Sequence, residues 1–224
     1  SPAHFVEVFT ERLSWVDTLV TKSAKFQYNI EDQAIHMYLE MIKSFVLATA
    51  FNDAELSVKG NLYQKKPRVQ KFDLELRKDG KDWTYVGDTM TGSKRIDNVF
   101  EIIHNIVENN IKGAYIETGV WRGGSSIFAK AVMSVLEPNS KRLQFVCDSF
   151  RGLPPGDSNV DAADIGWDNT PYLEVSDKIV ANNFAKYGLL DPNIIFVKGF
   201  FNETMIPLSK YIDSIAVMRL DVSN

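Results

Sequence analysis

One stretch decides the fold: Gly113-Ala-Tyr-Ile-Glu-Thr-Gly-Val-Trp-Arg-Gly-Gly-Ser-Ser-Ile-Phe-Ala-Lys130. The apolar residues after Gly113 have the length of a buried strand, and an amphipathic run begins near Ser125. Between them lie three glycines, which allow the backbone to approach a ligand closely: Gly119, Gly123 and Gly124. A glycine loop between a strand and the N-terminus of a helix is where α/β proteins bind nucleotides.

The acid at the end of this predicted strand indicates what kind of ligand the loop accepts. A dinucleotide fingerprint has the pattern Gly-x-Gly-x-x-Gly, but here Glu117 stands where the first glycine would be. An acid suits a cationic ligand, such as S-adenosylmethionine with its amino group and sulfonium, better than a pyrophosphate. The alternative is a tight strand–helix turn with a surface glutamate.

The composition is that of an ordinary globular protein. The 224 residues are 45% hydrophobic and 24% charged, with a net charge of −4 and a pI near 5.5. This balance argues against nucleic acid or an anionic membrane as partner, and no apolar run approaches the ~20 residues that span a bilayer. Cys147 is the single cysteine, so an intrachain disulfide is impossible and a reducing, cytoplasmic location is expected. The opening Ser-Pro-Ala-His favours a processed protein or a piece of a longer chain.

Two regions differ in pattern. Residues 4–24 and 31–50 have helical periodicity, and 52–80 are polar and basic, so we expect two helices followed by a connecting or mobile segment. Phe72–Leu76 alternates like a strand. We therefore predict a helical cap over 1–80 and an α/β domain over 81–224.

Within the second region, strand and helix patterns alternate, which predicts a Rossmann-like, doubly wound parallel sheet. A helix is expected at 94–110, before the first strand. The expected strands are 115–117, 143–147, 194–197 and 215–220, and the expected helices are 126–135, 176–187 and 203–209.

Each predicted strand ends in residues suited to a ligand site, which in open α/β sheets lies beyond the carboxyl ends of the strands. The first ends at Glu117 and the second at Asp148 and Ser149, where an acid can accept hydrogen bonds from a ribose diol. The third ends at Gly199 and Phe200, an aromatic that can flank a purine, and the fourth at Asp221.

These motifs closely resemble the macrocin O-methyltransferase (TylF-type) family over about Trp83 to Asp221. The family's members are class I methyltransferases that use S-adenosylmethionine and magnesium to methylate sugar hydroxyls, typically of deoxysugars on natural products. The resemblance rests on Gly80-Lys-Asp-Trp83, Asp88-Thr-Met-Thr-Gly-Ser-Lys-Arg-Ile-Asp97, Glu117-Thr-Gly-Val-Trp-Arg-Gly-Gly124, Asp148-Ser-Phe-Arg-Gly-Leu-Pro154, Asn183-Phe-Ala-Lys-Tyr-Gly-Leu-Leu-Asp191 and Arg219-Leu-Asp221.

The resemblance implies roles for single residues. The loop around the cofactor's methionine part would be formed by Glu117, Gly119 and Gly123, with Asp148 on the ribose. Thr89 and Met90 would cover the cofactor. Asp221 would be the first magnesium ligand and the catalytic residue, since an aspartate at a strand end suits a hard cation. The metal would bind two neighbouring sugar hydroxyls and lower the pKa of the attacked one.

Two departures from the family pattern stand out. The family follows Arg-Leu-Asp with Gly-Asp, whose second aspartate is its candidate general base, but here the position holds Ser223, a poor base unless activated. The family's later strands and a further acidic pair are expected to be absent from this chain, which ends at Asn224. Either the chain is part of a longer, multidomain protein or its metal site is incomplete.

The leading hypothesis is a sugar O-methyltransferase acting on a small-molecule or glycan acceptor. One alternative is an O-methyltransferase for a catechol or another vicinal diol, and another is a non-catalytic cofactor-binding or assembly domain. A nicotinamide dehydrogenase is disfavoured by the loop pattern. The long acidic tract 154–171 is expected to be a sugar-facing loop. A homo-oligomer is compatible with the sequence.

Overall fold

The computed structural model describes residues 30–51, 55–57, 68–155 and 170–221. The chain forms two compact units, 1–38 and 39–224, and the description below concerns the second. The expected helix at 4–24, most of the tract 154–171 and Ser223 lie outside the described residues. In the described part of the chain, no helix has the length and hydropathy needed to cross a membrane.

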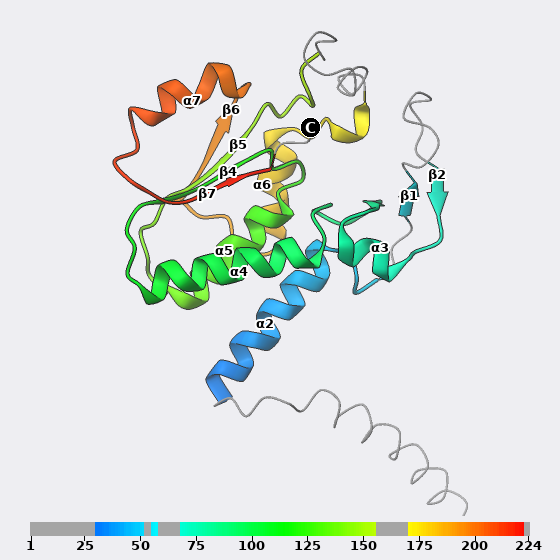
Figure 1. Ribbon diagram of the computed structural model, residues 1–224, viewed down its shortest axis with the longest axis horizontal. Helices are drawn as coiled ribbons and strands as arrows, with labels where there is room; N and C mark the ends of the chain where they lie inside the picture. The colour runs from blue at the N-terminus through cyan, green and yellow to red at the C-terminus, as the bar shows by residue number, and fades with distance from the viewer. Residues whose placement is uncertain (1–29, 52–54, 58–67, 156–169, 222–224) are drawn as a thin grey trace, which may run out of the picture. The chain divides into compact units, whose positions relative to one another are not determined.

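The core of the larger unit is a parallel four-stranded sheet in the order β6-β5-β4-β7 (Figure 1). The chain runs outward from β4 through β5 to β6 and then returns to place β7 on the other side of β4. This reversal next to β4 is the switch point at which open α/β sheets bind ligands. The predicted sheet is confirmed, with strands at Ala114–Thr118 (β4), Gln144–Asp148 (β5), Ile194–Lys198 (β6) and Ile215–Leu220 (β7).

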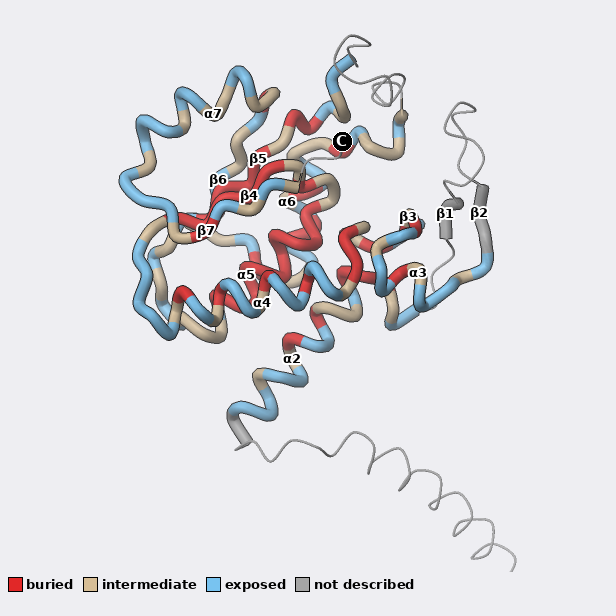
Figure 2. The backbone as a smooth tube through the Cα atoms, viewed as in Figure 1, coloured by how far each residue is buried: buried red, intermediate tan, exposed pale blue. Residues whose placement is uncertain are grey.

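Helices cover both faces of this sheet, as a doubly wound fold requires. On one face, α7 packs its apolar residues on the buried cluster Ala114, Ile116, Phe145 and Cys147. On the other, α5 lies against the sheet and α4 packs on α5; Figure 2 shows α5 buried along most of its length. The helices span Ser93–Glu108 (α4), Gly124–Leu136 (α5), Asp177–Lys186 (α6) and Phe201–Ser209 (α7), with a 3-10 turn at Pro171–Leu173.

The helix expected at 31–50 is Ile30–Val46 (α2), which ends earlier because Ala48 has a positive φ of 54°. The segment 52–80 is more than a connection. Glu55–Ser57 (β1), Arg68–Gln70 (β2) and Trp83–Thr84 (β3) form an antiparallel sheet in the order β2-β1-β3.

The strand expected at Phe72–Leu76 was wrong, because Leu74–Asp79 is a helix (α3). The Asp73 carboxylate accepts hydrogen bonds from the backbone amides of Glu75 and Leu76, which caps the helix start. At the other end Gly80 adopts the left-handed conformation, φ 65°, that commonly terminates helices. The cap over 1–80 stays a prediction; its described residues from 39 onward belong to the same unit as the α/β sheet.

A buried ion pair holds this region together. The Arg77 side chain on α3 is 1% exposed, and its Nε donates to Asp82 Oδ2 at 2.5 Å. Its Nη1 donates to the Leu47 carbonyl at 2.8 Å, which ties α3 to the residue that follows α2. Buried charges are rare in proteins unless paired in this way.

Candidate functional site

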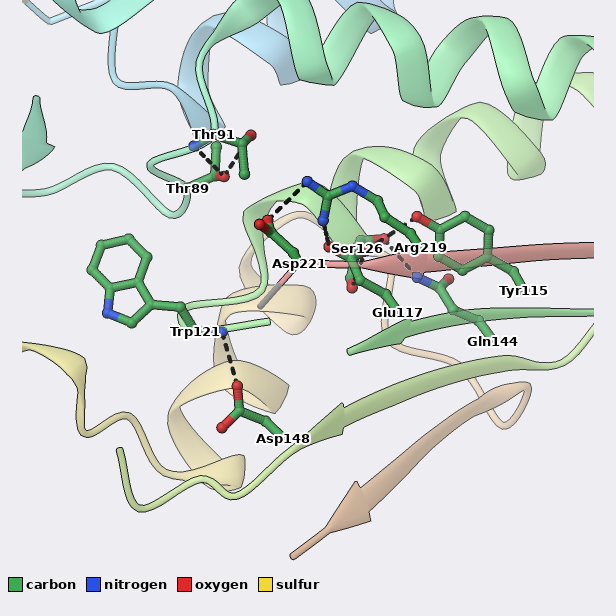
Figure 3. Close-up of polar contacts among 10 residues, drawn as sticks. All are labelled: Thr89, Thr91, Tyr115, Glu117, Trp121, Ser126, Gln144, Asp148, Arg219 and Asp221. Atoms are coloured by element: carbon green, nitrogen blue, oxygen red, sulfur yellow. Dashed lines mark hydrogen bonds and ion pairs between the residues drawn. The ribbon is translucent and has the colours of Figure 1, made fainter. Parts of the chain in front are cut away.

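The carboxyl ends of β4, β5 and β7 meet at one edge of the sheet, as the strand-end pattern predicts. Glu117 on β4 is in register with Arg219 on β7, and the Asp221 amide donates to the Thr118 carbonyl at 3.0 Å. Asp148 is the last residue of β5. Figure 3 shows the acidic side chains of all three strands around the loop that carries Trp121.

Glu117 is 1% exposed and is surrounded by groups of the chain itself. Its Oε1 accepts from Arg219 Nη1 at 2.5 Å, and its Oε2 accepts from the hydroxyls of Ser126, at 2.7 Å, and Tyr115, at 3.1 Å. Burial raises the pKa of the Glu117 carboxyl above its usual value, while Arg219 opposes the shift. The cation that this acid contacts in the structure is therefore the chain's own arginine, and a contact with cofactor stays a prediction.

Arg219 joins the two predicted acids, a role that the sequence reasoning missed. Its Nη1 binds Glu117, and its Nη2 binds Asp221 Oδ2 at 2.8 Å (Figure 3). The sequence signal was the Arg-Leu-Asp motif itself, which places a cation in an otherwise apolar strand two residues before the acid. Side chains two residues apart on a strand lie on the same face, so this spacing brings them together.

The glycine loop and the first residue of α5 pack tightly against neighbouring parts of the chain. Gly119 has a φ of 74° and Gly123 a φ of 87°, conformations that suit glycine. A Cβ on Gly123 would lie 2.7 Å from Val180 Cγ1 of α6, and one on Gly124 would lie 2.6 Å from the Asp88 carbonyl. The Gly124 amide donates to that carbonyl at 2.8 Å, so the helix start already has an acceptor from the chain.

We expect Gly124→Ala to lower the free energy of unfolding by about 1–3 kcal/mol, the usual effect of overpacking. The added methyl would collide with the Asp88 carbonyl and the Thr89 Cβ, in a segment held by backbone hydrogen bonds to Gly124 and Val46. Urea unfolding would measure the loss. Ser134→Ala on the exposed part of the same helix is the control, and an equal change in both variants would contradict the packing argument.

The segment that precedes α4 lies against this loop. The Thr89 amide donates to the Val46 carbonyl at 3.1 Å, and the Thr89 hydroxyl accepts from the Thr91 amide at 3.2 Å. Asp88 Oδ2 accepts from the hydroxyl of Tyr187, the residue that follows α6, at 2.7 Å. Thr89 is buried and Met90 half-buried, so the predicted cover is held in place next to α5.

Asp148 is half-buried and faces the same loop. Its Oδ2 accepts from the Trp121 amide at 3.2 Å, and its Oδ1 accepts from the Phe150 amide at 2.9 Å. Carboxylate oxygens have two lone pairs each, so both can accept further bonds from the hydroxyls of a ribose. The Asp148 carboxylate therefore has acceptor capacity for the hydroxyls of a ribose, and its contact with a cofactor stays a prediction.

The other predicted residues near Asp148 are placed as follows. The Ser149 hydroxyl donates to the Gly152 carbonyl and accepts from the Arg151 amide at 3.1 Å, so it shapes the turn. The Gly199 amide donates to the Asp148 carbonyl at 3.0 Å, which brings the end of β6 to this edge. Phe200 follows, with the Arg151 guanidinium 5.1 Å from its ring centre.

Aromatic side chains next to the loop were not identified as a group from the sequence. Trp121 stands between two glycines with a φ of 49°, unusual for a bulky residue, and its ring contacts that of Tyr172. Trp83 stacks on Tyr172 at 4.8 Å between ring centres. The Arg122 guanidinium lies 4.2 Å from the Trp121 ring centre, and its Nη1 donates to the carbonyls of Tyr85 and Gly87.

The predicted magnesium site is not formed by the described residues alone. Asp221 is the one residue predicted as a ligand, and its Oδ2 already binds Arg219. Across the described ranges, no three side chains of histidine, cysteine, aspartate or glutamate are grouped so as to hold a metal ion. The described residues thus supply one candidate ligand, Asp221, which alone cannot hold magnesium, so no chemical step is assigned to a metal.

Comparison with known proteins identifies the family to which the chain is similar. The family model described as macrocin-O-methyltransferase (TylF) matches residues 32–223. The chain is 33% identical over 195 residues to 8-demethyl-8-(2,3-dimethoxy-alpha-L-rhamnosyl)-tetracenomycin-C 4'-O-methyltransferase of Streptomyces olivaceus, covering 85% of this chain and 70% of that protein. It is 31% identical over 192 residues to mycinamicin III 3''-O-methyltransferase of Micromonospora griseorubida, covering 84% and 72%.

A solved structure agrees with the fold. The O-methyltransferase NovP superimposes with a TM-score of 0.70 at 29% sequence identity, over 84% of this chain and 72% of that chain. This likeness supports the α/β fold described above.

Proposed function

The chain belongs to the macrocin-O-methyltransferase (TylF) family and is an S-adenosylmethionine-dependent O-methyltransferase, and we propose that its acceptor is a sugar hydroxyl of a glycosylated natural product or a glycan. Relatives with about 30% identity support this proposal, since one is named for a rhamnosyl-tetracenomycin and one for mycinamicin III. The expected cytoplasmic location stays a prediction.

The observation that carries the proposal is the juxtaposition of Asp148 and the Glu117–Arg219–Asp221 group at one sheet edge (Figure 3). We propose that Asp148 binds the ribose and that Gly119 lets the backbone approach the methionine part. Thr89 and Met90 would cover the cofactor, and Phe200 would lie against the purine. The transferable methyl would then lie near the end of β7.

The loop supports this ligand over a dinucleotide. A pyrophosphate binds through unsatisfied amides at a helix N-terminus. Here the Gly124 amide donates to Asp88 and the Gly123 amide to the Val120 carbonyl at 2.7 Å. S-adenosylmethionine has no phosphate, so the occupied amides are no obstacle to it.

In the proposed reaction, the acceptor oxygen attacks the methyl carbon, the carbon–sulfur bond breaks, and S-adenosylhomocysteine leaves. The hydroxyl proton must depart as the bond forms. Asp221 stands at the end of β7 with its side chain 27% exposed, where it can accept a hydrogen bond from the acceptor hydroxyl. Positioning of the oxygen in line with the methyl would supply much of the catalysis.

We also propose that the methyl transfer depends on magnesium. The family resemblance and the position of Asp221 at the sheet edge support this. A metal, when bound, would polarise the acceptor hydroxyls. One alternative concerns the acceptor, since a catechol or another vicinal diol would share this cofactor site.

We expect wild-type protein to bind S-adenosylhomocysteine and Asp148→Ala to weaken that binding by about 1–3 kcal/mol, the usual loss for a hydrogen bond to a charged group. Calorimetry would measure both. Asp177→Ala is a suitable control, because that carboxylate is paired with Lys198 rather than aimed at the loop. If the folded wild type binds NAD and not S-adenosylhomocysteine, the cofactor assignment is overturned.

The acceptor is tested by methyl transfer from labelled S-adenosylmethionine to a panel of 6-deoxyhexosyl glycosides and catechols. Turnover confined to the glycosides supports the sugar proposal. Turnover confined to the catechols favours the alternative acceptor and would overturn the sugar proposal.

A further inference from the structure

Glu117, Arg219 and Asp221 form a chain of two ion pairs between neighbouring strands. The Arg219 guanidinium binds Glu117 Oε1 at 2.5 Å through one terminal nitrogen and Asp221 Oδ2 at 2.8 Å through the other. The planar guanidinium holds its donors in a fixed fork, so fixing one end of it also fixes the other. The orientation of Asp221 therefore depends on Glu117.

Glu117 itself is enclosed. Its second oxygen accepts from Ser126 of α5 and from Tyr115, and 1% of the residue is exposed. With so little of the residue exposed, a cofactor amino group could reach this carboxylate only if the side chains around it moved apart. Asp221, by contrast, is partly exposed at the strand end.

We propose that Arg219 is a positioning residue that orients the Asp221 carboxylate for methyl transfer, and that Glu117 acts on the site through Arg219 instead of touching the cofactor. This inference rests on the proposed function. In this scheme Glu117 helps to orient the residue that contacts the acceptor sugar. Affinity for the cofactor depends instead on Asp148 and the backbone of the glycine loop.

The first test compares S-adenosylhomocysteine affinity with turnover in Glu117→Gln, Arg219→Met, Arg219→Lys and the double variant Glu117→Gln/Arg219→Met. Turnover uses the best acceptor of the panel above. Arg219→Met is expected to lower kcat about 100-fold, the usual effect of a misplaced reacting group, with KM for S-adenosylmethionine nearly unchanged. Arg219→Lys, which keeps the charge but not the fork, should recover part of kcat. The double variant should be no slower than Arg219→Met alone.

The affinity for S-adenosylhomocysteine decides the role of Glu117 even when no acceptor is turned over. The proposal expects Glu117→Gln to bind within about threefold of wild type. A loss of tenfold or more, persisting in the Arg219→Met background, would show that Glu117 binds the cofactor directly and would overturn the proposal. A wild type that binds no cofactor overturns the proposed function instead.

A second test needs neither cofactor nor acceptor. The coupling between Glu117→Gln and Asp221→Asn is measured in the free energy of unfolding, with and without Arg219. We expect a favourable coupling that disappears in Arg219→Met, because two carboxylates without the guanidinium can only repel. A favourable coupling that survives without Arg219 would overturn the inference.

A matched control lies at the opposite edge of the sheet. Glu137 is held by Arg142, with Nη2 to Oε1 at 2.7 Å, in another carboxylate–guanidinium pair. Glu137→Gln should lower stability while leaving cofactor affinity and kcat unchanged. If it reduces kcat as much as Glu117→Gln does, the effect is one of general stability and not of position.

Discussion

Asp221→Asn is expected to lower kcat about 10²–10⁴-fold while leaving S-adenosylhomocysteine affinity close to that of wild type. The range is that of a lost proton acceptor, since asparagine keeps the shape of aspartate but cannot take the hydroxyl proton. Asp221 lies at the end of β7, next to β4, and Arg219 holds one of its oxygens. Methyl transfer to the best glycoside, with calorimetry on the same samples, measures both quantities.

Assays with a metal chelator distinguish the two roles predicted for Asp221, metal ligand and direct proton acceptor. If wild-type turnover falls in chelator and magnesium restores it, the carboxylate acts as a metal ligand as the family resemblance implies. If chelator has no effect and Asp221→Asn is inactive, the carboxylate acts directly. An Asp221→Asn enzyme with full turnover would remove the residue from the mechanism altogether.

Arg77→Met is expected to lower the free energy of unfolding by about 3–5 kcal/mol, the usual effect of removing one partner of a buried ion pair. The change keeps most of the side-chain volume but leaves the Asp82 carboxylate, 3% exposed, without its guanidinium contact. Urea unfolding with a full baseline on both sides would measure the loss.

The control for this prediction is Lys94→Met. Lys94 pairs with Asp79 at the surface, with its side chain 81% exposed, and surface pairs contribute little. If the buried Arg77–Asp82 pair stabilises the fold, Arg77→Met lowers the free energy of unfolding far more than Lys94→Met does. Similar losses in the two would count against it.

The sheet could be predicted from the sequence because its strands carry a local signal. Ala114–Thr118 and Gln144–Asp148 are apolar runs of strand length, each followed by a helical period, and their ends share one edge by the geometry of parallel sheets. The sequence pattern alone therefore predicts that Asp148 and Asp221 lie at the same edge. The family motifs then supplied the cofactor and the chemistry.

Side-chain partners far apart in the chain could not be predicted in this way. Arg219 contacts Glu117 across 102 positions, and the sequence offers no periodicity that links them. The stacking of Trp83 on Tyr172 is equally non-local. The helix α3 was missed for a different reason, because Phe72-Asp-Leu-Glu-Leu alternates like a strand. The N-cap at Asp73 and the left-handed Gly80 nevertheless favour a helix between them.

The position of β7 has a consequence for how the site comes into being during synthesis. Residues 114–198 contain β4, β5 and β6, whose pairings each close a shorter stretch of chain than the pairing of β7 with β4. These pairings can form while the chain is still emerging from the ribosome. β7 pairs with β4, from which it is separated by all of this sequence. Contacts between residues far apart in the sequence form more slowly, so we expect this pairing to form late. We therefore expect the part of the site that carries Asp148 to form before the part that carries Asp221, with the Glu117–Arg219 ion pair completed only when β7 pairs with β4.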